Sequence, residues 1–210
     1  MFDRFIASFR VEPPGQEAGT PWADDRLLGI AGYLELARRF AGCSFENGLY
    51  RIHDAVTGPQ AASLVGDAFP RFASRACPFG YDWLGRQFAA DSGRRREGGE
   101  ALVLLLEPGT GEALEIPFTF AAFHEELDAL REPALASSFF ASWAEANPRC
   151  VPLSATQCAG YKIPLFLGGQ DTVKNLEVID IDVYWSLSGQ LRSGARVLPP
   201  GTSIRRVDRA

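Results

Sequence analysis

The sequence has few of the side chains that carry most enzyme and metal chemistry: its 210 residues include two histidines, four cysteines and one methionine. Cys150 and Cys158 are the cysteines closest along the chain, no C-x-x-C pair occurs, and His53 and His124 lie far from both. Structural zinc sites need closer ligand spacing, and no thiol-enzyme signature surrounds any cysteine. The sequence therefore predicts no metal, no cofactor and no catalytic residue.

Long hydrophobic runs are also missing from the sequence. No apolar run approaches the roughly 18 residues of a membrane-spanning helix, so we expect no membrane contact of that kind. Asp3 and Arg4 interrupt the segment that a secretion signal would occupy. The cysteines lack the spacing of a disulfide framework, so reduced thiols and a cytoplasmic protein are expected.

The sequence also has fewer basic residues than acidic ones. Lysine occurs only at positions 162 and 174, and the formal net charge is −5. Because general nucleic-acid binders present a basic face, we expect no direct nucleic-acid contact, whereas a basic protein partner suits an acidic chain. A content of 46% hydrophobic and 22% charged residues is that of an ordinary globular protein.

Local patterns in the first seventy residues predict helices around one hairpin. Apolar residues recur at helical spacing over residues 2–9 and 24–42. Asn47-Gly48 between apolar residues is typical of a hairpin turn, because both positions tolerate a positive φ. A capped helix over residues 57–70 follows.

The middle of the chain predicts an antiparallel meander. Residues 79–88 form an aromatic strand with glycine bulges, and the strands at 101–106 and 113–118 are joined by a turn at 108–111. The Gly-Thr-Gly in this turn also occurs in dinucleotide-binding loops, but a strand pattern follows it where those loops have a third glycine and a helix. A hairpin turn is therefore favoured.

Two helices are predicted after the meander. The first begins at a Thr119 cap and directs His124 and several acidic residues outward. The second spans residues 133–147 and buries one aromatic side. We place a domain boundary near residue 132, between these two helices.

The stretch 160–191 has the densest apolar pattern of the chain. It predicts a strand at 161–167, a second strand at 176–179, and a helix that begins at Asp180 and has one apolar face, formed by Ile181, Tyr184, Trp185 and Leu191. A last edge strand is expected over residues 203–207. The predicted fold class is α+β: an antiparallel β-sheet meander flanked by helices, with a smaller C-terminal α/β subdomain.

Three segments of the sequence resemble a known family. KIPLFLGGQDTVKNLEVIDIDVYWSLSGQL (162–191) resembles the C-terminal domain of immunity proteins that protect bacteria from type VI secretion DNase toxins. SFENGLYRIHD (44–54) and FGYDWLGRQFAAD (79–91) resemble the GAD-like domain that precedes it in that family. The resemblance implies a GAD-like domain at 1–132, an immunity domain at 133–210, and a bacterial-competition protein without catalytic activity that binds a cognate DNase toxin.

Under this resemblance, the candidate toxin-binding residues are acidic groups and large aromatic groups. An acidic patch attracts the basic, DNA-accepting surface of such a toxin and covers it, and aromatic residues often anchor protein interfaces. Capping and solvation of the acids, and core packing of the aromatic rings, fit the same residues. The candidates are Glu125, Glu126, Asp128, Asp171, Glu177, Asp182, Trp83 and Tyr184.

A small-ligand-binding or regulatory module is the alternative function. The aromatic strand that carries Asp82, Arg86 and Gln87 stands beside glycine-rich turns, an arrangement that can line a pocket. These polar groups fit two roles, pairing within the fold or contact with a ligand. Ligand-dependent melting separates the alternative from a pure toxin inhibitor.

Overall fold

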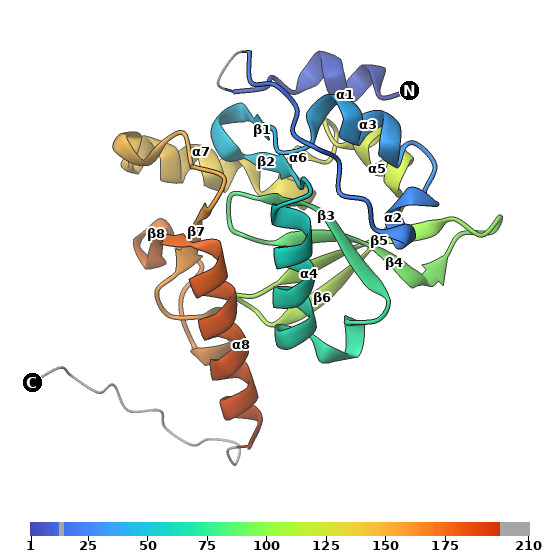
Figure 1. Ribbon diagram of the computed structural model, residues 1–210. Coiled ribbons are helices and arrows are strands. Elements are labelled where there is room, and N and C mark those ends of the chain that lie inside the picture. Colours follow the sequence, from blue (N-terminus) through green and yellow to red (C-terminus); the bar gives the residue numbers. More distant parts are fainter. Residues whose placement is uncertain (13–14, 198–210) are drawn as a thin grey trace, which may run out of the picture.

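The chain forms two antiparallel sheets, seen in a computed structural model that describes residues 1–12 and 15–197 (Figure 1). Each strand of the larger sheet pairs with the next strand in sequence, which gives the order β1 to β6. The strands are β1 (Ser44–Phe45), β2 (Tyr50–Ile52), β3 (Ala76–Asp82), β4 (Gln87–Arg95), β5 (Ala101–Glu107) and β6 (Glu112–Thr119), with β7 (Gln157–Tyr161) and β8 (Leu176–Asp180) in the smaller sheet.

Helices cover both faces of the larger sheet (Figure 1). Because successive side chains of a strand point to opposite faces, Phe88 packs on Phe123 of α5, whereas Gln87 faces α4 and α8. The predicted α+β class is confirmed. The helices are α1 (Asp3–Ser8), α2 (Asp25–Leu28), α3 (Tyr33–Phe40), α4 (Thr57–Ala68), α5 (Phe120–Glu126), α6 (Arg131–Leu135), α7 (Ser137–Ala146) and α8 (Ile181–Val197).

His124 is fully buried, so the prediction that it points outward is wrong. It lies on the same side of α5 as Phe120 and Phe123, between the sheet and α1. Its Nε2 lies 2.9 Å from the Tyr50 hydroxyl and its Nδ1 lies 2.8 Å from the Phe120 carbonyl oxygen. Both ring nitrogens therefore have partners, and burial lowers the pKa of His124 to about 4.

Three predicted elements are each divided in two. The helix expected over 24–42 becomes α2 and α3, separated by a turn that ends at Gly32 with φ 82°. The strand expected over 79–88 becomes β3 and β4, joined by a tight turn in which Gly85 has φ 75°. The helix expected over 133–147 breaks at Ala136, whose φ is 49°. Positive φ ends a regular helix or strand, and side-chain periodicity does not report it.

The strand predicted at 161–167 is also misplaced. The pairing strand β7 ends at Tyr161, and Leu165–Leu167 form a 3₁₀ turn in which the amides of Leu165 and Phe166 donate to the Gly109 carbonyl oxygen. Pro164 has no N–H for a ladder, which favours the end of pairing before it. The hairpin at Asn47-Gly48, the strands β5, β6 and β8, and the helix after Thr119 are confirmed. The strand predicted at 203–207 lies outside the described residues.

Buried polar contacts attach the C-terminal segment to the larger sheet. The guanidinium group of Arg51 on β2 donates to the carbonyl oxygens of Ser154 (2.6 Å) and Gln157 (2.7 Å) and lies 4.4 Å from the centre of the Tyr81 ring. Trp185 of α8 donates to the Gly85 carbonyl oxygen at 2.7 Å. These bonds fix the start of β7 and the helix α8 against the sheet. No helix among the described residues is long and apolar enough to cross a bilayer.

Candidate functional site

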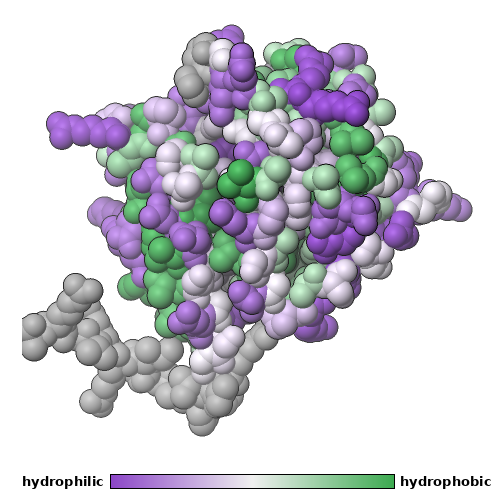
Figure 2. Space-filling view, in the orientation of Figure 1, coloured by the Kyte–Doolittle hydropathy of each residue, from purple (hydrophilic) through white to green (hydrophobic). Residues whose placement is uncertain are grey.

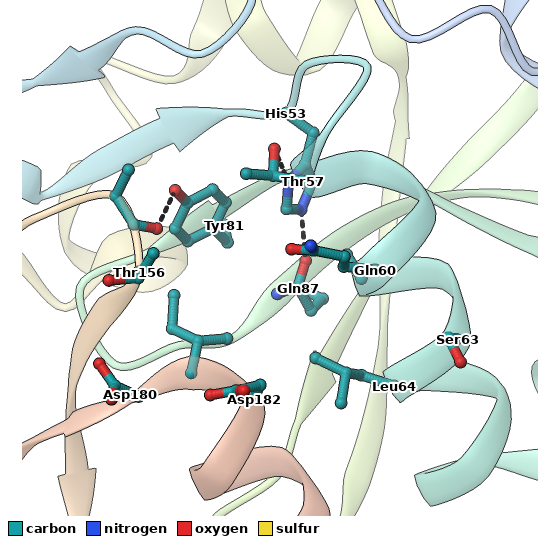
Figure 3. A pocket seen from close by; sticks show the side chains of 13 residues that line it. His53, Thr57, Gln60, Ser63, Leu64, Tyr81, Gln87, Thr156, Asp180 and Asp182 are labelled. Atoms are coloured by element: carbon teal, nitrogen blue, oxygen red, sulfur yellow. Dashed lines mark hydrogen bonds between the residues drawn. The ribbon is translucent and has the colours of Figure 1, made fainter.

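A cleft of about 590 Å³ lies between α4, the start of α8 and the larger sheet (Figure 3). We refer to it as the α4–α8 cleft. Tyr81 and Gln87, neighbours across β3 and β4, form its floor. Leu64 of α4 forms one wall, and Thr156 and Ile181 form the other. Its volume falls within the range of small-molecule sites, roughly 300–1,000 Å³.

His53 forms the inner end of the cleft and joins its floor to α4. Its Nε2 lies 2.7 Å from Gln87 Oε1, its Nδ1 lies 3.1 Å from the Thr57 hydroxyl, and its ring stacks on Tyr81. Because burial lowers the pKa of His53 to about 4, the imidazole is neutral at neutral pH. The inner end of the cleft is therefore polar and uncharged.

The local sequence explains why α4 begins beside this histidine. Asp54 accepts the backbone amides of Val56 (3.0 Å) and Thr57 (2.8 Å), which satisfies two donors at the start of the helix. The strand β2 has just ended, so His53 stands between the sheet and α4. The first turns of α4 then supply the upper wall of the cleft.

Asp180 and Asp182 form an acidic rim where β8 passes into α8 (Figure 3). Both side chains are exposed, and neither forms an ion pair with a residue that the structure describes. Asp182 Oδ1 accepts the amide of Val183 at 2.8 Å, and the Ile181 amide donates to the Thr156 carbonyl oxygen. The lining residues include no lysine or arginine. The rim is therefore an uncompensated negative region.

The acidic candidates Glu125, Glu126 and Asp128 lie near the end of α5, far from this cleft (Figure 1). Glu126 pairs with Arg4 at 2.8 Å and Asp128 pairs with Arg131 at 2.8 Å. Two of these three carboxylates therefore hold neighbouring parts of the fold.

The other acidic candidates lie around β8 and α8. Asp171 accepts the Tyr161 hydroxyl at 2.6 Å. Glu177 on β8 and Asp182 on α8 are exposed, and only Asp182 lines the α4–α8 cleft. The structure therefore divides the predicted acidic set between two separate regions and brings one member to the cleft.

The aromatic candidates Trp83 and Tyr184 are both buried. Trp83 donates to the Leu135 carbonyl oxygen at 2.9 Å and packs against Phe140 and Trp143. Because the protein itself covers both rings, they pack in the core.

A line of apolar side chains is exposed along α8. Val183, Leu187 and Leu191 are 43%, 49% and 43% exposed and are spaced four residues apart. We call these three residues the α8 ridge. Figure 2 shows apolar surface over the region of α8, beside polar surface. Of the residues predicted to form the apolar face of this helix, Tyr184 and Trp185 are buried, whereas Leu191 is exposed.

The buried cysteines have little nucleophilic character. Cys43, Cys77 and Cys158 are enclosed by the core, and burial raises the pKa of each thiol. A thiolate, which is the reactive form, is therefore disfavoured. Among the described residues, no three histidine, cysteine or carboxylate side chains gather as they would around a metal ion.

Sequence patterns only partly identified this site. The sequence marks Gln87 as a polar residue of the aromatic strand, but its neighbours Leu64 and Thr156 come from segments far apart along the chain. The α8 ridge had a local signal, since apolar residues at 183, 187 and 191 add a second line to the buried face of that helix.

Comparisons with known proteins indicate both a fold and a family. Residues 123–192 match the family model described as "T6SS immunity protein Tdi1, C-terminal", which supports a T6SS immunity role and, with it, binding of a partner toxin protein. The crystal structure of Atu4351 from Agrobacterium tumefaciens has the same fold, with a TM-score of 0.61, 15% identity, and coverage of 90% of this chain and 89% of that chain. No curated protein matches this chain.

Proposed function

We propose that this chain is a cytoplasmic immunity protein that binds a cognate type VI secretion DNase toxin and blocks it without catalysis. The observation that carries the proposal is the family match over residues 123–192. This segment contains the first part of α8 with its exposed ridge, and the acidic rim of the cleft. The segment with the family signature thus includes exposed carboxylates without an ion pair among the described residues and exposed apolar surface. The resemblance of residues 44–54 and 79–91 to a GAD-like domain remains a prediction.

Occlusion is the mechanism that these features support best. A DNA-cutting enzyme needs a basic face for phosphates, and the exposed carboxylates Glu177, Asp180 and Asp182 favour encounter with such a face. The α8 ridge then supplies apolar area to be buried in the complex. A stable interface buries roughly 1,600 Å² in total, so the ridge would form its centre with polar groups around it.

Co-expression with a nuclease-like toxin from an adjacent open reading frame tests this proposal. Cells that express the toxin and this chain should survive, and the two purified proteins should form a complex in gel filtration. Survival equal to that of cells with toxin alone, together with the absence of a complex, contradicts the proposal.

A matched pair of leucine variants tests the role of the α8 ridge. Leu187→Glu places a charge within the ridge, and Leu114→Glu places the same charge on β6, at a similarly exposed site outside α8. We expect Leu187→Glu to raise the Kd for the toxin by tenfold or more and to reduce protection, whereas Leu114→Glu leaves both close to wild type. Equal effects of the two variants exclude the ridge from the interface.

The α4–α8 cleft favours a second candidate function, a small-ligand-binding module. Its volume and its mixture of polar and apolar lining suit a metabolite. Thermal melting across a metabolite panel distinguishes the two functions, because a ligand that binds the folded chain raises its melting temperature. Stabilisation by a metabolite, without any complex with the toxin, favours this second function.

A further inference from the structure

The floor of the α4–α8 cleft holds a buried amide group with an unused hydrogen-bond donor. Gln87 is 1% exposed, and its Oε1 is paired with His53. Its Nε2 makes no hydrogen bond to any residue in the described part of the chain, and in Figure 3 this nitrogen is directed into the cleft. Because Gln87 lines the cleft, this N–H group is open to a hydrogen-bond acceptor there. This position is therefore suited to an acceptor oxygen that enters from outside.

The rim selects for positive charge. Asp180 and Asp182 stand on either side of Ile181 at the mouth of the cleft, and no cationic side chain lines it. His53, the basic residue at the inner end, is neutral because it is buried. A cation at the rim would thus meet two carboxylates and no repulsion from the lining.

The walls suit the aliphatic part of a long basic side chain. Leu64 and Ile181 are half-buried and face the cleft together with Ala61. Lysine and arginine place their methylene stems along such surfaces while the charged end reaches a polar group. The cleft thus has an available N–H donor on its floor, apolar walls and an acidic rim. These features suit a peptide segment with a basic side chain better than they suit a free ion.

We propose that the α4–α8 cleft receives a basic segment of the toxin, in which an arginine or lysine pairs with Asp180 and Asp182 and a carbonyl oxygen accepts from Gln87 Nε2. This inference rests on the proposed function and adds the chemistry of the recognised element. The cleft then fixes the position of the toxin segment, and the α8 ridge supplies adjacent contact area.

Two cleft variants and one matched control test the inference. Asp180→Asn with Asp182→Asn removes the rim charge at exposed positions, and Gln87→Met removes the amide while keeping the length of the side chain. The control, Glu97→Gln with Glu100→Gln, makes the same charge change on the exposed turn between β4 and β5. Melting temperatures establish that each variant is folded.

Affinity for the purified toxin, carrying an inactivating substitution, is measured at low and at moderate salt. We expect each cleft variant to raise the Kd at least tenfold, with the rim variant also less sensitive to salt, and the control to change it less than twofold. Hydrogen exchange should slow in the first turns of α4 and α8 when the toxin binds.

The outcomes separate this inference from the function on which it rests. If the wild-type chain binds the toxin and the rim variant binds it as tightly as the control does, the cleft is not the recognition site, although the immunity function stands. If the wild-type chain does not bind the toxin, both proposals fail. The rim variant alone keeps the test valid should Gln87→Met reduce folding.

Discussion

The buried imidazole of His124 makes the stability of this protein sensitive to mild acid. In the folded chain its pKa is about 4, against an ordinary value of 6.5, because burial among Phe2, Phe5 and Phe120 disfavours the charged form. As pH falls below 6.5, the unfolded chain takes up a proton that the folded chain does not. His124 therefore lowers the free energy of unfolding progressively as pH falls from about 6.5 to about 4.

The size of this effect follows from the two pKa values. Between pH 7.5 and pH 5.5, His124 should remove about 1.3 kcal/mol from the free energy of unfolding. Glu107 acts in the opposite direction over this range, since burial raises its pKa to about 7 in the folded chain. His53, whose pKa burial also lowers to about 4, acts in the same direction as His124. The total pH dependence thus mixes these three groups, and a variant without the His124 imidazole is needed to isolate its share.

His124→Gln provides that comparison, because glutamine does not titrate and still offers a polar group toward the Tyr50 hydroxyl. Urea unfolding of both proteins at pH 7.5 and 5.5 gives the stability difference between them at each pH. We expect the advantage of the wild-type chain to shrink by about 1.3 kcal/mol at the lower pH, while the His53 and Glu107 contributions, present in both proteins, cancel. A difference that is the same at both pH values would refute the reasoning.

Two further substitutions test how the sheet is packed, each by urea unfolding at pH 7.5. Arg86→Met leaves the fully buried Asp82 carboxylate without the guanidinium group that donates to it at 2.7 Å. We expect this variant to lower the free energy of unfolding by about 3–5 kcal/mol. Adding Asp82→Leu to that variant should restore much of the loss, and a double variant no more stable than the single one contradicts this account. Gly80→Ala places a methyl group 2.7 Å from both the Tyr50 hydroxyl and a backbone carbonyl oxygen, so we expect it to lower the free energy of unfolding by about 1–3 kcal/mol. An unchanged urea midpoint would contradict this expectation.

The sequence determined much of the secondary structure and the overall class. Alternating residues over 113–118 and the apolar run at 101–106 specified β6 and β5, and Thr119 marked the start of α5. These signals are local, because a strand or helix has a fixed residue period and its caps use adjacent side chains. Where a positive φ interrupts an element, as at Ala136, the period continues across the break and the pattern misses it.

Which groups meet each other was decided only by the tertiary structure. The sequence marks His124 and Gln87 as polar residues among apolar ones, and it does not say that an aromatic core encloses the first or that a cleft opens over the second. Gln87, Leu64 and Asp182 come together because α4 and α8, which are far apart along the chain, pack against each other beside the larger sheet. The side-chain period fixes which face of its own element a residue occupies. Whether another element covers that face, and which one, depends on contacts between distant segments.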